Sequence, residues 1–582
     1  MKTRVLSRLA RVAFVLASTA PLPLSAAPTA TPSPAPTPIF IKQGGKWTPD
    51  TRKDFYSRDQ GSQIMPLRWM QALKQPDGQP FLAGSLSRFG YLPNEASDPP
   101  GLPVGFTVAS GSGVRQIGLT CSACHTRQIE VAGNSYRIDG GPAIADAQSL
   151  FAGIDTAVNA VLSSDTAFTD FAVAVLGPNP PPDEKAKLRQ EVAAWHLRYH
   201  TLMKDALPSP SWGVGRVDAV GMIFNRLTGL DIGPPPTYLI PENIKPATAP
   251  ARYPFLWNAP VQDKTQWPGF ADNGSNILGL SRNLGEVYGV FGAFFPTKSW
   301  WRVLGIDYLA NNSANFEGLN ALEELVRKIG PPQWAWEVNQ PLATQGKEIF
   351  GRTTVQGGCV SCHGIKPGET RFPDWKTWAT PVLDVGTDSR EYSILGWTVK
   401  TGVLEGAKIP FLKERLKPVD TAFNVLGTSV IGSILQHYVP VLMDEKAQPE
   451  SKTTPPSPFT PQTEDLKGAF NQPVPGATPS FAYESRVLQG IWAAAPYLHN
   501  GSVPTLAELL KLAAERVGSF KVGPAYDIVN VGLAAEQTKF DYVMQTTDCS
   551  DRDSGNSRCG HEYGTKLSPD EKKALLEYLK TL

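Results

Sequence analysis

Two short segments of this chain each place two cysteines and a histidine in the order Cys-x-x-Cys-His. The first segment is GLTCSACHTRQ, at positions 118–128, and the second is GGCVSCHGI, at positions 357–365. Two thiols three positions apart can form thioether bonds to the vinyl groups of one porphyrin, and the next histidine can then bind its iron. The chain is therefore expected to fold around two large, flat groups.

Three other uses of paired cysteines compete with this interpretation: a thioredoxin-like redox pair, a structural zinc site built from both pairs, and a disulfide within one pair. Here a histidine follows each pair at once, and the chain begins with an export signal, which suits the compartment where haem c is attached in bacteria. We therefore predict two covalently bound haem c groups. The predicted haem-binding residues are Cys121, Cys124, His125, Cys359, Cys362 and His363.

Residues 1–27 are predicted to be a cleaved signal peptide. Four basic residues within the first eleven positions precede a short apolar run at 12–20, and small residues follow at 25–27. The run is too short to span a bilayer, which takes about 20 residues. We expect a periplasmic or secreted protein without stable membrane insertion. The net charge of +1 gives no reason to expect a nucleic-acid partner.

Composition and spacing predict a mainly α-helical, loop-rich fold with few short strands. The 52 glycines and 53 prolines indicate many turns. Proline-rich breaks stand at 28–38 (a tether), 177–182, 233–236 and 445–480. Helices are expected at 183–203 and 317–329, with a last helix that begins after Ser568 and presents Ala574 to Leu582 as an apolar face. Short strands are expected at 116–119 and 129–136.

Two haem domains are predicted, at 39–330 and 331–582. A short helix at 342–350 leads to the second Cys-x-x-Cys-His segment, and the last helix can pack across it. That arrangement resembles the crossed terminal helices of class I cytochrome c. The first segment has no such leading helix, so the N-terminal domain is expected to be the more elaborate one.

The remaining histidines separate the two haems. Among them, His561 is the first candidate to bind the second haem opposite His363, with His499 as the rival and Met544 as a weaker third. No histidine occurs at 126–195 and no methionine at 127–202. The first haem therefore lacks an obvious second ligand, and an iron with one open face can bind oxygen or peroxide.

Three histidines have no predicted haem role. His196 and His200 are four positions apart on an expected helix and so share a face. A metal pair is one interpretation and two surface side chains the favoured one, while His437 has no supporting context. The remaining cysteines, Cys549 and Cys559, are expected to form a disulfide in an oxidising compartment.

At these residues the chain resembles the di-haem cytochrome c peroxidase superfamily, closest to its oxygenase branch of rubber oxygenases and bacterial fatty-acid dioxygenases. The matching segments are 55–62, 118–125, 282–291, 495–506 and 560–564. The resemblance implies that the first haem, on His125, binds dioxygen, and that His363 and His561 both bind the second. Typical peroxidases have a histidine soon after the first motif and a methionine in the stretch that corresponds to 501–528, and this chain has neither.

Eleven aromatic residues between positions 253 and 301 are candidates for a substrate pocket, although most are expected to be core. The resemblance places a phenylalanine over the active haem, with Phe291 chosen before Phe294. It also places a tryptophan between the haems, with Trp267 chosen before Trp257. Glu286 is either an acid–base group or a structural carboxylate.

The expected function is that of a haem-dependent dioxygenase that adds O2 to an unsaturated apolar substrate, either a fatty acid or polyisoprene. The first alternative is a di-haem cytochrome c peroxidase that reduces H2O2, which needs an acid–base group near the iron. The second is an electron-transfer cytochrome, in which both irons have two protein ligands. A small redox protein is a candidate electron donor.

Overall fold

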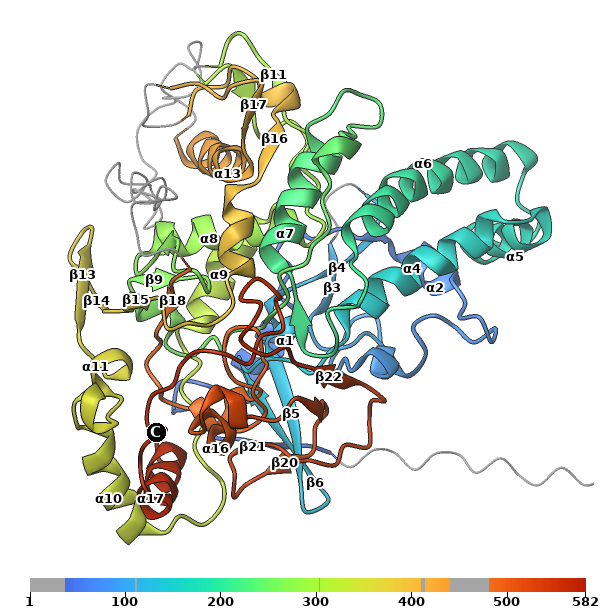
Figure 1. The fold of residues 1–582 in the computed structure, drawn as a ribbon. Helices are drawn as coiled ribbons and strands as arrows, with labels where there is room; N and C mark the ends of the chain where they lie inside the picture. The colour runs from blue at the N-terminus through green and yellow to red at the C-terminus, as the bar shows by residue number, and fades with distance from the viewer. Residues whose placement is uncertain (1–36, 110–112, 303, 410–413, 440–480) are drawn as a thin grey trace, which may run out of the picture. The chain divides into compact units, whose positions relative to one another are not determined.

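A computed structural model describes the chain in five stretches, namely 37–109, 113–302, 304–409, 414–439 and 481–582 (Figure 1). The predicted signal peptide, nearly all of the tether and the proline-rich segment at 445–480 lie outside the described residues. Residues Pro38–Leu582 form one compact unit. Within the described stretches, no helix has both the length and the apolar character that a membrane crossing requires.

Helices form most of the regular structure. They are α1 (Pro49–Ser57), α2 (Leu67–Ala72), α3 (Cys121–Cys124), α4 (Ala147–Leu162), α5 (Asp165–Leu176), α6 (Pro182–Ala206), α7 (Ala219–Phe224), the π-helical η2 (Asn225–Asp231), α8 (Asn276–Gly289), α9 (Phe316–Val326), α10 (Gln340–Phe350), α11 (Val360–His363), α12 (Arg390–Ser393), α13 (Ala422–Tyr438), α16 (Leu506–Leu509) and α17 (Pro569–Lys580).

The strands are short, as expected, but numerous, so the fold is mixed rather than mainly α. Every sheet among the described residues has two or three strands. The paired strands are β1 (Ile39–Phe40), β6 (Asn134–Asp139) and β5 (Thr126–Val131); β2 (Met65–Pro66), β4 (Gln116–Leu119) and β3 (Phe106–Ala109); β7 (Arg216–Val217) and β8 (Ala251–Arg252); β9 (Lys264–Thr265) and β10 (Ala271–Asp272); β11 (Thr297–Lys298) and β12 (Ile306–Asp307); β13 (Pro367–Arg371) and β14 (Trp375–Trp378); β15 (Val382–Leu383) and β18 (Tyr483–Glu484); β16 (Thr398–Lys400) and β17 (Val419–Thr421); β19 (Ser519–Lys521) and β22 (Val543–Gln545); and β20 (Tyr526–Asp527) and β21 (Gly532–Leu533).

The strongest capping signals predict helix starts correctly. The last helix, α17, has the expected capping box, in which the Ser568 side chain accepts from Glu571 N–H and the Glu571 side chain accepts from Ser568 N–H. Helix α6 covers the predicted range 183–203, and α9 begins at Phe316 and ends three residues before the predicted end at 329.

The strand predicted over 129–136 is wrong in one respect, because a turn divides it. Strands β5 and β6 form an antiparallel hairpin in which Val131 pairs with Asn134. Ala132 and Gly133 make the turn, with φ of 49° and 80°. Two successive residues with positive φ give a turn whose twist matches that of paired strands.

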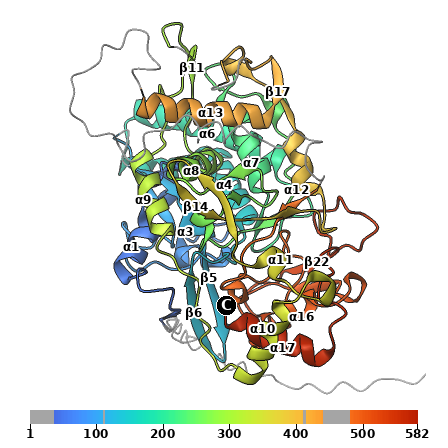
Figure 2. The ribbon, with the colours of Figure 1, turned by 90° about the vertical axis from the view of Figure 1, so that its left-hand side faces the viewer.

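Helices α10 and α17 cross at close range, as the C-terminal pattern predicts (Figures 1 and 2). A Cβ atom at Gly346 would lie 2.0 Å from the Ala574 carbonyl oxygen, so only glycine allows this approach. Phe350 and Tyr578 pack edge to face across the crossing, with ring centres 5.4 Å apart. The two helices place the second Cys-x-x-Cys-His segment against the core.

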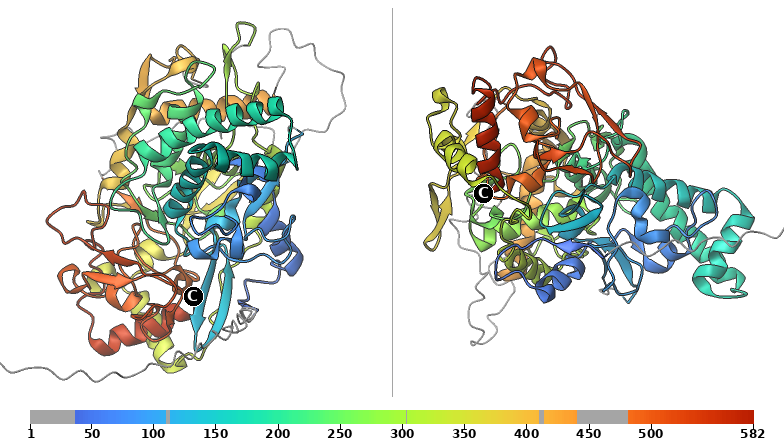
Figure 3. Two further views of the ribbon diagram at one scale, coloured as in Figure 1. Left: turned by 90° about the vertical axis from the view of Figure 1, so that its right-hand side faces the viewer. Right: turned by 90° about the horizontal axis from the view of Figure 1, so that it is seen from below.

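One buried core joins the two predicted haem domains. Trp257 and Ile329, from before the predicted boundary at 330/331, belong to the same apolar cluster as Trp492 and Leu575, from after it. The boundary itself stays a prediction. On another part of the unit, α4, α5 and α6 pack against one another, and α2 packs against α5 (Figures 1 and 3).

Candidate haem-binding cavities

The first Cys-x-x-Cys-His segment forms the short helix α3 between β4 and β5, and His125 follows it. His125 Nδ1 donates to the Pro254 carbonyl oxygen at 2.8 Å. A carbonyl can only accept, so this bond fixes the proton on Nδ1 and leaves the Nε2 lone pair for a metal. Burial lowers the pKa of His125 to about 4 and so keeps the imidazole neutral, as iron binding requires.

One cavity collects the residues of the first motif and the predicted pocket residues. Cys121, Cys124 and His125 line it together with the three predicted pocket residues, Phe291, Trp267 and Glu286. Of the eleven aromatic residues at 253–301, the four that line this cavity are Tyr253, Phe255, Trp267 and Phe291. The second choices, Phe294 and Trp257, are fully buried and are not among the lining residues.

Sequence reasoning missed Met222, a residue of α7 that lines the same cavity. A methionine thioether can be the second axial ligand of a haem iron. Met222 lies 97 positions after His125, so no local spacing rule connects the two residues. Among the described residues that line this cavity, His125 is the only histidine.

Glu286 faces the cavity from α8 and accepts a hydrogen bond from Gln266 Nε2 at 3.1 Å. Burial raises its pKa, although the Arg282 charge works in the opposite direction. The residue is half-buried, and its side chain borders the cavity. A carboxyl group in such a position can exchange a proton with a bound molecule.

The second motif has the same support behind its histidine. His363, at the end of α11, donates from Nδ1 to the Arg486 carbonyl oxygen at 2.8 Å, which leaves Nε2 for a metal. Burial lowers the pKa of His363. Cys359 and His363 line a cavity together with His561 and His499.

The rings of His363 and His561 have a separation that suits two ligands of one iron. Their centres are 6.0 Å apart. Metal–imidazole bonds of about 2.0–2.1 Å on both sides of one ion put the ring centres about 6 Å apart. Burial lowers the pKa of His561 to about 3, and its Nδ1 is buried with no hydrogen-bond partner among the described residues. The pair fits a bis-histidine haem.

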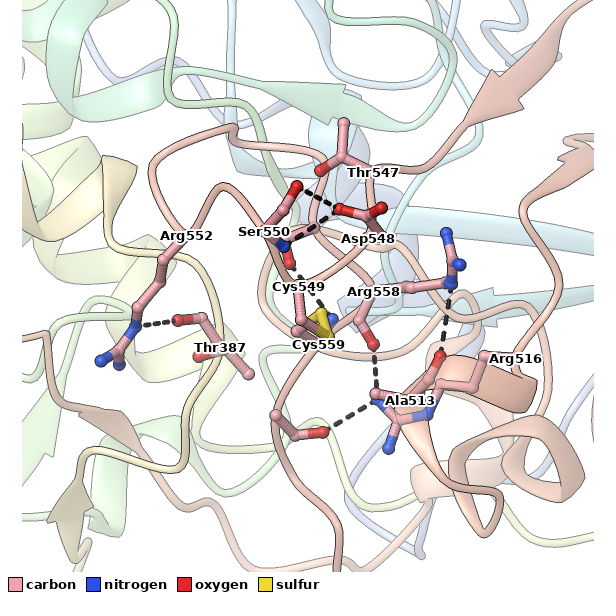
Figure 4. The surroundings of a disulfide bond; sticks show 12 residues. Thr387, Ala513, Arg516, Thr547, Asp548, Cys549, Ser550, Arg552, Arg558 and Cys559 are labelled. Atoms are coloured by element: carbon pink, nitrogen blue, oxygen red, sulfur yellow. Dashed lines mark hydrogen bonds between the residues drawn. A yellow bond between two sulfur atoms is a disulfide. The ribbon is translucent and has the colours of Figure 1, made fainter.

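Several contacts hold the His561 loop in place. His561 and Gly560 both have positive φ, of 52° and 75°, and a Cβ atom at Gly560 would lie 2.4 Å from a backbone atom of Gly386. Arg516 donates to the Gly560 carbonyl oxygen at 2.8 Å. The predicted disulfide between Cys549 and Cys559 is present and closes two residues before His561 (Figure 4). A strained backbone persists only where its surroundings fix it, as they do here.

The rival residues are placed differently. His499 lines the same cavity, but its Nε2 lies 2.8 Å from Asp388 Oδ2 and its ring stacks on Tyr483 with centres 3.8 Å apart. Met544 is buried in β22 and is not among the lining residues. His437 stacks on Phe316 with ring centres 4.0 Å apart.

The two cavities share a wall. Trp267, Arg252 and Arg486 line both of them. The Trp267 indole N–H donates to the Arg252 carbonyl oxygen at 3.0 Å, and the Arg252 guanidinium lies 4.7 Å from the centre of the Trp267 ring. Trp267 thus borders both cavities, and its role between two haems stays a prediction of the resemblance.

Arg252 carries a buried charge that the Glu484 carboxylate, also on the shared wall, offsets only from beyond ion-pair distance. Its guanidinium donates to the carbonyl oxygens of Leu498 and Tyr253, and no described carboxylate forms an ion pair with it. Burial lowers its pKa to about 9. A buried cation is costly without an anion, and haem carries two propionates. This wall therefore fits the group that the two motifs predict.

Comparison with known proteins places the chain beside two relatives and one family. Residues 482–521 match the family described as RoxA-like, cytochrome c-like. The chain is 30% identical over 597 aligned positions to "Uncharacterized protein y4iJ" of Sinorhizobium fredii (strain NBRC 101917 / NGR234). The alignment covers 92% of each of the two chains. The chain is 24% identical over 345 positions to "Uncharacterized protein y4iM" of the same organism, covering 56% of this chain and 63% of that one.

The matched segment forms part of the wall of the second cavity. It contains Tyr483, Glu484, Arg486 and His499, but neither Cys-x-x-Cys-His motif. The match indicates a cytochrome c-like protein, which implies covalent haem c and an oxidoreductase function. It also supports the resemblance to rubber oxygenases over these residues.

Proposed function

We propose that this chain, which belongs to the family of the y4iJ protein of Sinorhizobium fredii, is an exported di-haem oxygenase that adds O2 to an unsaturated fatty acid. Haem c held by Cys121, Cys124 and His125 would supply O2 binding and its transfer to a carbon–carbon double bond. The second haem, between His363 and His561, would exchange electrons with the first.

The observation that carries the proposal is the difference between the two cavities. His363 faces a second histidine, whereas the cavity of His125 presents Phe291 and other apolar side chains. A mainly apolar lining admits an alkene, while the three arginines and three glutamates in the same lining are the groups on which the peroxidase alternative depends. Trp267, on the shared wall, is proposed to lie on the electron path between the haems.

A second, larger groove supports a fatty acid as the substrate. This outer groove has a volume of about 1070 Å³, and its mostly apolar lining comes from α2, α5 and α6 together with β2, the start of β4, η2 and the residues that follow α8. Phe291 lines both the outer groove and the cavity of His125. Phe291 therefore stands between the outer groove and the first cavity, and a long chain that lay in both would have to displace its ring.

Charge distinguishes the two candidate substrates. Four arginines line the outer groove with one glutamate, Glu191. Two of them, Arg68 and Arg115, are exposed and form no ion pair with any described residue. An anionic head group gains from such a lining and a neutral polyisoprene does not.

The test supplies the haem-loaded protein with oleate or polyisoprene latex and measures O2 consumption and products by mass spectrometry. We expect oleate to consume O2 and to yield a product heavier by two oxygen atoms. If O2 is consumed with latex and not with oleate, the proposed substrate is polyisoprene and not a fatty acid. Without uptake from either substrate, and with H2O2 turnover by a reduced cytochrome, the oxygenase proposal fails.

Glu286 favours a peroxidase as the second candidate, because a carboxyl group in the cavity can move the protons that O–O cleavage needs. Burial raises the pKa of Glu286. As the pH is lowered, its ionised fraction, and with it peroxidase turnover, would therefore begin to decrease at a higher pH than for an exposed glutamate. Glu286→Gln should abolish H2O2 turnover in a peroxidase and leave oleate oxygenation largely intact in an oxygenase.

A further inference from the structure

We propose that Asp155, His196 and His200 bind one divalent transition-metal ion such as Zn2+, at a site apart from both haem cavities. Neither the predicted haem chemistry nor the proposed substrate uses these residues. None of the three lines either haem cavity. The proposal rests on how α4 and α6 pack, and it stands whether or not the protein is an oxygenase.

The three side chains converge from two helices. His196 and His200 are four positions apart on α6 and share one face of it, with ring centres 5.2 Å apart. Asp155 comes from α4, which packs against α6. One ligand atom from each residue lies within 4.8 Å of the other two.

The distances are those of ligands around one ion. Asp155 Oδ1 lies 3.1 Å from His196 Nε2, and Asp155 Oδ2 lies 2.9 Å from His200 Nδ1. Ligands bound at about 2.0–2.1 Å in tetrahedral geometry are separated by roughly 3.3 Å. The two carboxylate–imidazole distances are close to that spacing, so an ion could take the place of the two imidazole protons.

The ligand set selects the class of ion. Two imidazoles and one carboxylate suit Zn2+, Cu2+ or Ni2+, whereas Ca2+ and Mg2+ prefer oxygen ligands throughout. Three protein ligands leave at least one coordination position for water.

Solvent can reach the site. The side chain of His200 is 49% exposed, while those of His196 and Asp155 are 13% and 17% exposed. An ion can therefore enter along His200 and come to rest against two partly buried ligands. Partial burial strengthens the attraction between the carboxylate and a divalent cation.

The same two helices also hold Phe291, through side chains within about one turn of the three ligands. Tyr199, on α6, stacks on Phe291, and Phe151, on α4, packs against it edge to face, each with ring centres 5.6 Å apart. An ion that joins Asp155 to α6 would therefore steady the helices around the residue where the outer groove meets the first cavity. We expect it to slow amide hydrogen exchange along α6 and leave exchange in α17 unchanged.

The experiment uses the full haem-loaded protein, stripped with a chelator and titrated with Zn2+ by calorimetry. We expect one Zn2+ per chain by elemental analysis, beyond the haem iron. His200→Gln and Asp155→Asn should each weaken Zn2+ binding by at least about 100-fold, because each removes one of three ligands. His437→Gln is the matched control, since it removes an exposed histidine of another helix, and should bind Zn2+ like the native protein.

Two results would overturn the proposal. One is that the native protein takes up no Zn2+, which would mean that the three side chains only form hydrogen bonds between α4 and α6. The other is that His200→Gln and Asp155→Asn retain native Zn2+ affinity, so that the ion binds elsewhere. Circular dichroism of each variant establishes that it is folded, and His196→Gln provides a second ligand deletion if one of the others is not.

Discussion

The two Cys-x-x-Cys-His sites have the same kind of hydrogen-bond partner at the histidine Nδ1 but different groups in the cavity that its Nε2 is expected to face. His125 and His363 each donate from Nδ1 to a backbone carbonyl at 2.8 Å. In front of His363 stands His561, with ring centres 6.0 Å apart. The cavity of His125 presents Phe291, Met222 and a carboxyl group, and no second histidine among its described lining residues.

The difference teaches that the motif itself does not decide what a haem site does. In both sites the cysteines and the histidine lie within five positions of one another, and a distant backbone carbonyl, of Pro254 or Arg486, orients the histidine. The group opposite the histidine comes from elsewhere: His561 lies 198 positions after His363 and is held by a disulfide, Arg516 and a left-handed backbone. Function is therefore assigned by the distant loops that complete each cavity.

Removal of the cysteines of one motif should have the largest effect. Cys359→Ala with Cys362→Ala, and separately Cys121→Ala with Cys124→Ala, should each leave about half of the native haem, because thioether bonds attach each group. Haem per chain is measured by the pyridine haemochrome assay. Only the second double variant should also lose all O2 uptake with oleate. If either double variant keeps the native haem content, that motif does not hold a haem.

His561→Ala should convert one of the two irons from low spin to high spin, because that iron loses a strong ligand. Electron paramagnetic resonance of the oxidised protein measures the change. His499→Ala is the comparison, and we expect it to leave both spin states as in the native protein. The reverse pattern would assign the ligand role to His499.

Phe291→Trp should lower kcat/KM for oleate by about 10–100-fold, because a larger ring is harder to displace from the boundary between the outer groove and the first cavity; this corresponds to about 1.4–2.7 kcal/mol. The spectrum of the second haem should not change. Phe294→Leu is the control: it also alters a buried phenylalanine, but one outside the cavity lining. An equal loss of kcat/KM in both variants would mean that Phe291 acts through packing alone.

Met222→Leu should have the smallest effect. Leucine is close to methionine in volume, so we expect a stability loss below about 1.5 kcal/mol. The absorption spectrum of the first haem should stay that of an open site. A shift to a more high-spin spectrum in the variant would show that the Met222 thioether binds the first iron. Both irons would then have two protein ligands, which favours the electron-transfer alternative.

Local signals account for what could be predicted. The capping box at Ser568, the helix leading to Cys359 and the packing of the last helix across it all depend on residues close in sequence or on one pair of helices. The sequence does not predict the hairpin at Ala132, because alanine rarely adopts positive φ and an alanine at this position is not a turn signal. Strand number was underestimated because two-residue strands carry no periodic pattern.

The sequence by itself determined the two haem motifs, the pairing of Cys549 with Cys559 and the lack of a nearby second ligand for His125. Only the tertiary structure decided that His561 faces His363, that Met222 lines the first cavity, and that Asp155 joins His196 and His200. The physical reason is range: motif spacing is fixed by the covalent chain, whereas the far side of a cavity depends on how distant segments pack.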